Sequence, residues 1–263
     1  MIRGPIHEQG FLILPKDGRV IFVLPWCQNY TLIGTTESVY QENQFDHISI
    51  SPEEEEYLYA AMREFFPSLN LEPQDILYKY SGVRSLIDSG GSNSTSLSRE
   101  SIVTEDWDDL GGGYLAIFGG KLTTYRSMGE KVINKVQKRH EPAGKWVANT
   151  QNDPLPGGAR VCAKTLSSVH AESIKLGVDE SLLKILKFRY GSRWIEIIRL
   201  IAENRELLTP IGNPNYLKAE IAFAIREEMA KDLDDFILRR TKIAYELDEA
   251  GKKEVLKVIE EMK

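Results

Sequence analysis

The hydrophobic pattern of the chain changes at one segment, and this change limits the folds that it can adopt. Residues Glu141–Gly158 contain three prolines and three glycines and show no periodic apolar pattern. Before this segment, short β-branched and aromatic runs alternate with turn residues, and after it apolar residues recur at helical spacing. We therefore expect two domains, at residues 1–144 and 152–263, joined by a linker, with the second domain all-helical.

The runs in the first domain predict strands. Phe11–Leu14, Val20–Leu24 and Tyr30–Thr36 are separated by turn residues, and Pro25 is expected to end the second run. These strands predict an antiparallel or mixed sheet with flanking helices, and hence an α+β fold. Further strands are expected at Ile76–Tyr80, Ser101–Thr104 and Tyr114–Phe118, with a surface loop at Asp88–Ser98.

Capping signals place two of the helices. Ser51 and Glu54 have the spacing of a capping box, so the acidic run that follows Ser51 is interpreted as a solvated helix start rather than a metal site. In the second domain, Pro214 suits the first turn of a long helix, and the apolar pattern continues to Ala244.

Composition excludes several classes of function. The net charge of -6 gives no basic surface for nucleic acid, and no apolar run is long enough to span a bilayer. The two cysteines, Cys27 and Cys162, are far apart, which fits a reducing cytoplasm and gives no metal-site spacing. Each is expected to be a small buried hydrophobe rather than a nucleophile.

The sharpest local motif is the sequence FGGKLTTYR at Phe118–Arg126. Gly119 and Gly120 between a strand and a helix allow a backbone or a flat ring to approach closely. The free N–H groups of the helix start, together with Lys121, favour negative charge at that place. A tight turn with a surface lysine explains the same residues about equally well.

Two arginines have a related placement. Arg84 follows a glycine at the end of a predicted strand, and Arg99 precedes the next strand. A guanidinium at such a position can bind an anionic group through paired donors. Each arginine alone is more often a surface residue, and the lysine turn strengthens the functional interpretation. Gly34–Glu37 is interpreted as a simple strand end.

In order and approximate spacing, these segments resemble the C-terminal part of the FAD-dependent, aerobic-type glycerol-3-phosphate dehydrogenases. The resemblance covers almost the whole chain, and the ordered set is specific although single motifs such as LIGTT are weak. The matching stretches are Arg19–Trp26, Leu32–Thr36, Tyr80–Leu86, Ser98–Glu100, Phe118–Arg126, Leu155–Gly158, Tyr190–Ser192 and Ala219–Thr241.

The resemblance implies a site. Residues 1–144 would be a partial FAD- and substrate-binding domain of the D-amino-acid-oxidase type. Arg84, Arg99 and Lys121 would be catalytic residues that face the substrate phosphate and the reacting carbon. The residues implied to line the flavin ring are Gly119, Gly120, Lys121, Leu122 and Thr123. No metal is implied.

The implied reaction is oxidation of sn-glycerol 3-phosphate to dihydroxyacetone phosphate, with hydride passing to the flavin and electrons going on to a quinone. The resemblance also implies a role in glycerol metabolism, a cytoplasmic location on the inner face of a membrane with peripheral contact, and a homodimer as one option. The family's G-x-G-x-x-G fingerprint and its proposed histidine base have no counterpart here, so the chain alone is expected to lack FAD and activity. Two alternatives stay open: an oxidase that uses oxygen, and a non-catalytic remnant that acts as an interaction module.

Overall fold

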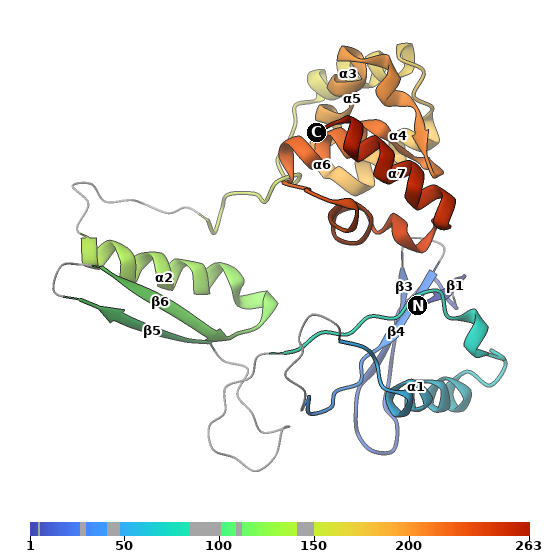
Figure 1. Ribbon diagram of the computed structural model, residues 1–263, viewed down its shortest axis with the longest axis vertical. Coiled ribbons are helices and arrows are strands. Elements are labelled where there is room, and N and C mark those ends of the chain that lie inside the picture. The colour runs from blue at the N-terminus through green and yellow to red at the C-terminus, as the bar shows by residue number, and fades with distance from the viewer. Residues whose placement is uncertain (5, 27–29, 41–47, 85–100, 109–111, 141–149) are drawn as a thin grey trace. The chain divides into compact units, whose positions relative to one another are not determined.

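The chain forms two compact units, Met1–Ala148 and Asn149–Lys263, each of which combines helices with at least one small antiparallel sheet (Figure 1). This architecture confirms the expected α+β class. The structure is a computed structural model, and it describes residues 1–4, 6–26, 30–40, 48–84, 101–108, 112–140 and 150–263.

A four-stranded antiparallel sheet, in the order β1-β4-β3-β2, begins the first unit. Alternation along β3 buries Ile21 and Val23 against helix α1 and leaves Phe22 on the opposite face. Pro25 does not end β3 as expected. At Pro25, β3 pairs with β4 and no longer with β2. The missing N–H of the proline therefore costs the sheet no hydrogen bond. The strands are β1 (Ile2–Arg3), β2 (Phe11–Ile13), β3 (Ile21–Trp26) and β4 (Tyr30–Gly34).

Helix α1 (Pro52–Phe65) begins at the predicted capping box. The Ser51 hydroxyl accepts a hydrogen bond from the Glu54 N–H, and the Glu54 carboxylate accepts one from the Ser51 N–H, both at 3.2 Å. After the 3-10 turn η1 (Pro73–Asp75), no strand forms at Ile76–Tyr80, so that prediction is wrong. That segment makes one isolated bridge, between Ile2 and Ile76, and otherwise adds no strand to the sheet.

The rest of the first unit is a hairpin with one helix. Strands β5 (Ser101–Trp107) and β6 (Gly113–Gly119) pair along their full length, and the turn η3 (Leu122–Thr124) leads into α2 (Tyr125–His140). The order of strand, glycine turn and helix is as predicted. The expected loop at Asp88–Ser98 lies outside the described residues.

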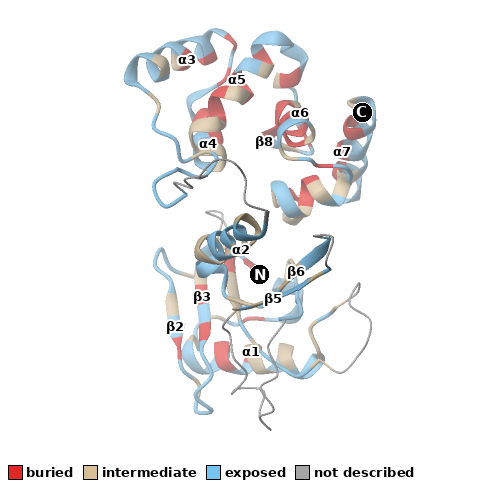
Figure 2. Ribbon diagram, turned by 90° about the vertical axis from the view of Figure 1, so that its left-hand side faces the viewer, coloured by how far each residue is buried: buried red, intermediate tan, exposed pale blue. Residues whose placement is uncertain are grey.

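The second unit is mostly helical, and its buried residues form two hydrophobic clusters that share Met262 at their edges. Figure 2 shows these buried residues gathered on α4, α5 and α6. The elements are α3 (Ala163–Lys175), α4 (Glu180–Tyr190), η4 (Gly191–Arg193), α5 (Trp194–Glu203), η5 (Arg205–Leu208), α6 (Lys218–Glu227), the π-helix η6 (Asp235–Arg240), η7 (Ile243–Tyr245) and α7 (Glu249–Glu261).

A short hairpin, β7 (Pro210–Ile211) with β8 (Asn213–Leu217), corrects the expectation of an all-helical domain. Pro214 lies in β8 and does not start a helix, and α6 begins only at Lys218. The hairpin turns at Gly212, whose φ is +58° and whose missing Cβ leaves room for Leu247. The long helix expected to run to Ala244 ends at Glu227.

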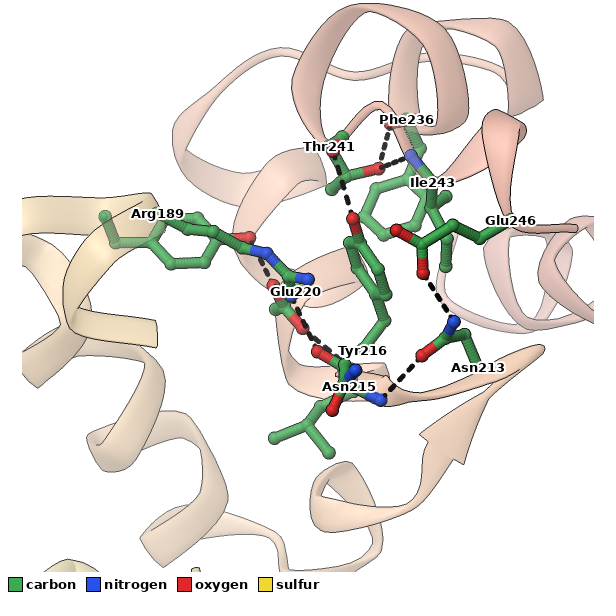
Figure 3. Close-up of polar contacts among 11 residues, drawn as sticks. Arg189, Asn213, Asn215, Tyr216, Glu220, Phe236, Thr241, Ile243 and Glu246 are labelled. Carbon is green, nitrogen blue, oxygen red and sulfur yellow. Dashed lines mark hydrogen bonds and ion pairs between the residues drawn. The ribbon is translucent and has the colours of Figure 1, made fainter. Parts of the chain in front are cut away.

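The hairpin is joined to the helices by a fully buried carboxylate, that of Glu220 (Figure 3). Its oxygens accept hydrogen bonds from the Arg189 guanidinium and the Tyr190 hydroxyl, both at 3.0 Å, and from the Leu217 N–H at 2.8 Å. Arg189 also donates to the Asn215 carbonyl at 2.7 Å. Burial raises the pKa of Glu220, and Arg189 opposes this shift. All three partners of the Glu220 carboxylate donate hydrogen bonds to it, and such donors stabilise the ionised form of a carboxyl group.

We predict that Glu220→Ala lowers the free energy of unfolding of the second unit by about 3 kcal/mol, because it leaves buried donors without an acceptor. Chemical denaturation measures this loss. The control is Glu227→Ala on the same helix, which removes an exposed contact with Arg193 and should cost less than about 0.5 kcal/mol. Equal losses in the two variants would contradict a special role for Glu220.

The same group gives a pH dependence. Because the folded-state pKa of Glu220 lies above its ordinary value of 4.5, its contribution to stability is full below that value. The contribution falls as the pH rises through the folded-state pKa. The difference in unfolding free energy between the unmutated chain and Glu220→Gln should therefore shrink with rising pH, and a constant difference would contradict this.

We also propose that the two units are independent domains, with the boundary within Glu141–Gly158. Each unit has hydrophobic clusters of its own: one in the first unit and two in the second. Residues 149–263, produced alone, should therefore give a helical circular dichroism spectrum and a cooperative unfolding transition that matches one transition of the whole chain. A non-cooperative transition would contradict the proposal.

Candidate functional site

A cavity of about 650 Å³ lies in the first unit, between the sheet, α1 and the segment that ends at Arg84. Much of its wall is apolar, with Phe22, Leu24 and Leu32 on one side. Its polar part includes Glu37 and Arg84. A mainly apolar pocket with a few converging polar groups is the usual form of a small-molecule site.

Arg84 is held at this cavity by an ion pair. Its Nη1 donates to Oε1 of Glu37 at 2.7 Å, and the two side chains are 50% and 52% exposed. The contact uses one of the five N–H donors that a guanidinium carries. A pair so exposed is worth about 1 kcal/mol or less, so an incoming anion can compete with Glu37 for the arginine.

A second ion pair lines the same cavity. Lys79 contacts Glu55 at 2.6 Å, and Glu55 also accepts a hydrogen bond from the Tyr59 hydroxyl at 3.3 Å. Burial, reinforced by the charge of Glu55, raises the pKa of Tyr59, so the phenol stays protonated at neutral pH. The cavity wall therefore carries two cations, each with a carboxylate partner.

The glycine turn after β6 is open to solvent. Gly119 and Gly120 have φ values of +67° and +97°, a conformation that favours glycine. Leu122 is 89% exposed, and Lys121 and Thr123 are exposed as well. Within the described part of the chain, the Lys121 ammonium has no hydrogen-bond or ion-pair partner. The turn thus presents a cation, a hydroxyl and the first N–H groups of a helical segment to an incoming ligand.

The structure does not join the three predicted cations directly. Arg84 lines the cavity, whereas Lys121 is absent from the described lining residues, and Arg99 lies outside the described residues. No hydrogen bond or ion pair between described residues links Arg84 with Lys121. Their convergence on one anion therefore stays a prediction.

Sequence reasoning missed Glu37, Glu55 and Lys79 as cavity residues. Gly34–Glu37 was interpreted as a strand end, and Glu55 as part of a solvated helix start. Glu37 and Arg84 are 47 positions apart, so no local spacing signals their contact. Only the placement of Glu37 directly after a strand hinted at a site.

Other candidates are weaker. Cys162, expected to be buried, is exposed at the start of α3, where hydrogen bonding to Thr165 lowers the pKa of its thiol; Cys27 lies outside the described residues. Over the described ranges, no three metal-ligating side chains come together, and none of the helices is both long and apolar enough to cross a bilayer.

Comparison with protein families accounts for both units. Residues 2–126 match the model of the FAD dependent oxidoreductase family, and residues 148–263 match that of the C-terminal domain of alpha-glycerophosphate oxidase. The aerobic glycerol-3-phosphate dehydrogenase of Bacillus subtilis (strain 168) is 32% identical over 245 residues, which are 90% of this chain and 43% of that protein. The glycerol-3-phosphate dehydrogenase of Synechocystis is 34% identical over 89% of this chain and 42% of its own length.

A relative with another name, the D-erythritol 1-phosphate dehydrogenase of Brucella abortus, is 31% identical over 92% of this chain and 47% of its own length. Among solved structures, glycerol-3-phosphate dehydrogenase from Bacillus halodurans, complexed with FAD, shares the fold with a TM-score of 0.69. It is 24% identical and covers 97% of this chain and 53% of its own. The chain spans about half or less of the length of all these proteins. It belongs to the family of FAD-dependent oxidoreductases whose second domain is the C-terminal domain of alpha-glycerophosphate oxidase.

Proposed function

We propose that this chain supplies the substrate-binding and flavin-facing residues of an enzyme that oxidises sn-glycerol 3-phosphate to dihydroxyacetone phosphate. The observation that carries the proposal is Arg84, a half-exposed guanidinium on the wall of a mainly apolar cavity. The relatives from Bacillus subtilis and Synechocystis are glycerol-3-phosphate dehydrogenases, which supports the choice of substrate.

In this proposal Arg84 binds the phosphate. A phosphate monoester carries close to two negative charges and matches the paired donors of a guanidinium. Glu37 holds the arginine before the substrate arrives. The weak, exposed ion pair then gives way to the stronger contact with the dianion. Arg99 and Lys121 would complete the anion site.

The glycine turn fits the flavin of the family. Gly119 and Gly120 hold the turn at positive φ, which glycine adopts without strain, and the exposed Leu122 and Thr123 can contact a flat ring. Bound FAD supplies the acceptor for the hydride of the substrate. Lys121 and the N–H groups at the start of η3 favour negative charge on a ring placed against them. These residues hold and polarise the ring and carry out no chemical step themselves.

The two substrates named among the relatives share one chemistry, that of a phosphorylated polyol. We favour glycerol 3-phosphate, a quinone as electron acceptor and contact with a membrane surface. The name of the matched C-terminal domain keeps an oxidase that uses oxygen as the alternative. We expect the chain by itself to bind FAD weakly and to show no turnover.

The test is a chimera in which residues 1–263 are joined to the part of the Bacillus subtilis relative that the match does not span. The proposal expects this chimera to bind FAD and to oxidise glycerol 3-phosphate faster than erythritol 1-phosphate, with a quinone analogue as acceptor. Rapid flavin reoxidation by oxygen would favour the oxidase. A folded, FAD-loaded chimera that oxidises neither phosphate would reject the proposed function.

We predict that Arg84→Ala in the chimera lowers kcat/KM for glycerol 3-phosphate roughly 30- to 1,000-fold. This corresponds to a loss of about 2–4 kcal/mol of transition-state stabilisation. Oxidation of glycerol, which has no phosphate, should be unchanged. Arg63→Ala on α1 is the control, because Arg63 is an exposed arginine that pairs with Glu56 away from the cavity. An unchanged preference for the phosphorylated substrate would show that Arg84 does not bind the phosphate.

A second prediction concerns the turn. Gly120→Ala forces an alanine to φ of +97° and places its Cβ 3.1 Å from Sδ of Met128, so it strains the turn by about 1–2 kcal/mol. The chimera should then bind FAD roughly 5- to 30-fold more weakly. Gly129→Ala in α2 meets open space and should leave FAD binding unchanged. Equal FAD affinities in the two variants would contradict a role for this turn.

A further inference from the structure

The first turn of helix α1 carries two carboxylates, those of Glu54 and Glu55, that line the cavity. Glu54 belongs to the capping box, in which its Oε2 accepts a hydrogen bond from the Ser51 N–H. Its other oxygen, Oε1, accepts a hydrogen bond from the Ser38 hydroxyl at 3.0 Å. The carboxylate that caps the helix therefore also holds the residue that follows Glu37.

Glu55 makes a second link, to the segment that ends at Arg84. Its Oε2 lies 2.6 Å from the ammonium of Lys79, which precedes Arg84 on that segment. Its Oε1 accepts a hydrogen bond from the hydroxyl of Tyr59, a side chain that is only 7% exposed. Tyr59 lies one turn further along α1, so it fixes the Glu55 carboxylate against the body of the helix.

The two segments that carry the arginine and its carboxylate partner depend on such side-chain contacts. Residues 35–40 and 79–84 contain no helix or strand. Between described residues, no backbone–backbone hydrogen bond involves either segment. A further side-chain link is the Ser81 hydroxyl, which donates to the Ile48 carbonyl at 2.9 Å. Side chains, rather than a backbone ladder, therefore set the course of both segments along the cavity.

We propose that the first turn of α1 positions the Arg84 guanidinium for the phosphate of the substrate. Glu54 acts through Ser38, on the side of the carboxylate partner of the arginine. Glu55 acts through Lys79, and neither Glu54 nor Glu55 contacts the phosphate. The proposal rests on the proposed function, in which Arg84 binds that phosphate. Because small displacements of a binding group are costly, contacts remote from the ligand affect how well it binds.

Position and charge predict opposite effects for one substitution. A carboxylate near an anion site repels the anion, so Glu55→Gln should tighten anion binding if only the charge of Glu55 matters. If Glu55 holds Lys79 in place, the same substitution loosens the segment and weakens anion binding. Ser38→Ala changes no charge, so it tests the link through Glu54 separately. Glu54 itself is left in place, because its replacement would also remove the capping box.

The experiment titrates the whole 263-residue chain with inorganic phosphate and follows the guanidinium resonances of Arg84 by NMR. The loss of these resonances in Arg84→Ala assigns them. Ser38→Ala and Glu55→Gln should each weaken phosphate binding about two- to tenfold, the range that corresponds to one hydrogen bond. Ser38→Thr keeps a hydroxyl and should restore the affinity of the unmutated chain.

The same variants have a kinetic signature in the FAD-loaded chimera. Ser38→Ala and Glu55→Gln should raise KM for glycerol 3-phosphate and leave kcat within about twofold, because a displaced arginine loses its contact in the ground state and the transition state alike. Oxidation of glycerol, which has no phosphate, should be unchanged. A loss of folded enzyme would lower kcat for both substrates instead.

Tyr57→Phe on the same helix is the matched control. It removes one hydroxyl hydrogen bond, from Tyr57 to Asp17 at 3.1 Å, and neither residue belongs to the lining of the cavity. Phosphate affinity should therefore be unchanged. Thermal unfolding checks that every variant folds.

The proposal fails if either Ser38→Ala or Glu55→Gln binds phosphate as tightly as the unmutated chain, or more tightly. It also fails if Tyr57→Phe weakens binding as much as they do, or if the Arg84 resonances do not respond to phosphate. A chimera that oxidises neither phosphorylated substrate rejects the proposed function instead. Should the chain then still bind phosphate at Arg84 with the expected order of affinities, the positioning by α1 stands without that activity.

Discussion

The buried carboxylate of Glu220 is the contact on which the second unit depends. It receives donors from α4 and from the junction of β8 with α6, so one side chain fixes the hairpin against the helical core. A hydrophobic cluster lies on each side of this contact, and both clusters take residues from α6. Apolar packing supplies the stability of the unit, but it is not directional. The carboxylate supplies direction, because each of its donors must approach from one angle.

The first unit distributes its polar groups differently. Its ion pairs at the cavity, Arg84 with Glu37 and Lys79 with Glu55, keep substantial exposure to solvent. Such pairs contribute little to folding. Because breaking these ion pairs costs little free energy, they suit a surface whose charged groups change partners. The second unit thus holds the Glu220 carboxylate in a buried, fully paired contact, whereas the first unit keeps its charged pairs at the cavity where the proposed substrate would bind.

Some elements could be predicted from near neighbours in the sequence, and others could not. The capping box of Ser51 and the order of β6, glycine turn and α2 depend on neighbours within a few positions, and both were predicted. The helix start predicted at Pro214 is wrong, because proline is found both at helix starts and in edge strands. The tight turn at Gly212 pairs the segment with β7 and so makes it a strand. The expected strand at Ile76–Tyr80 had suitable residues, but the edge strand beside it, β1, is only two residues long, so the pairing stops at the single bridge between Ile2 and Ile76.

The site shows the same division. Of the predicted cations, Lys121 follows a strand that the structure contains, β6, whereas the strand expected before Arg84 is not formed. The contact of Arg84 with Glu37 could not be predicted, since it joins segments 47 residues apart. Nor does one sequence show that both residues line a single cavity, which depends on how α1 packs against the sheet.

The Arg84–Glu37 pair also bears on selectivity among anions. Glu37 is a competitor tethered beside the arginine, with an effective concentration on the order of millimolar. Under the proposed function, a singly charged anion offers the guanidinium no more charge than the carboxylate does, whereas a dianion offers more. The pair would therefore bias this site toward doubly charged ligands before the cavity wall selects among them by shape.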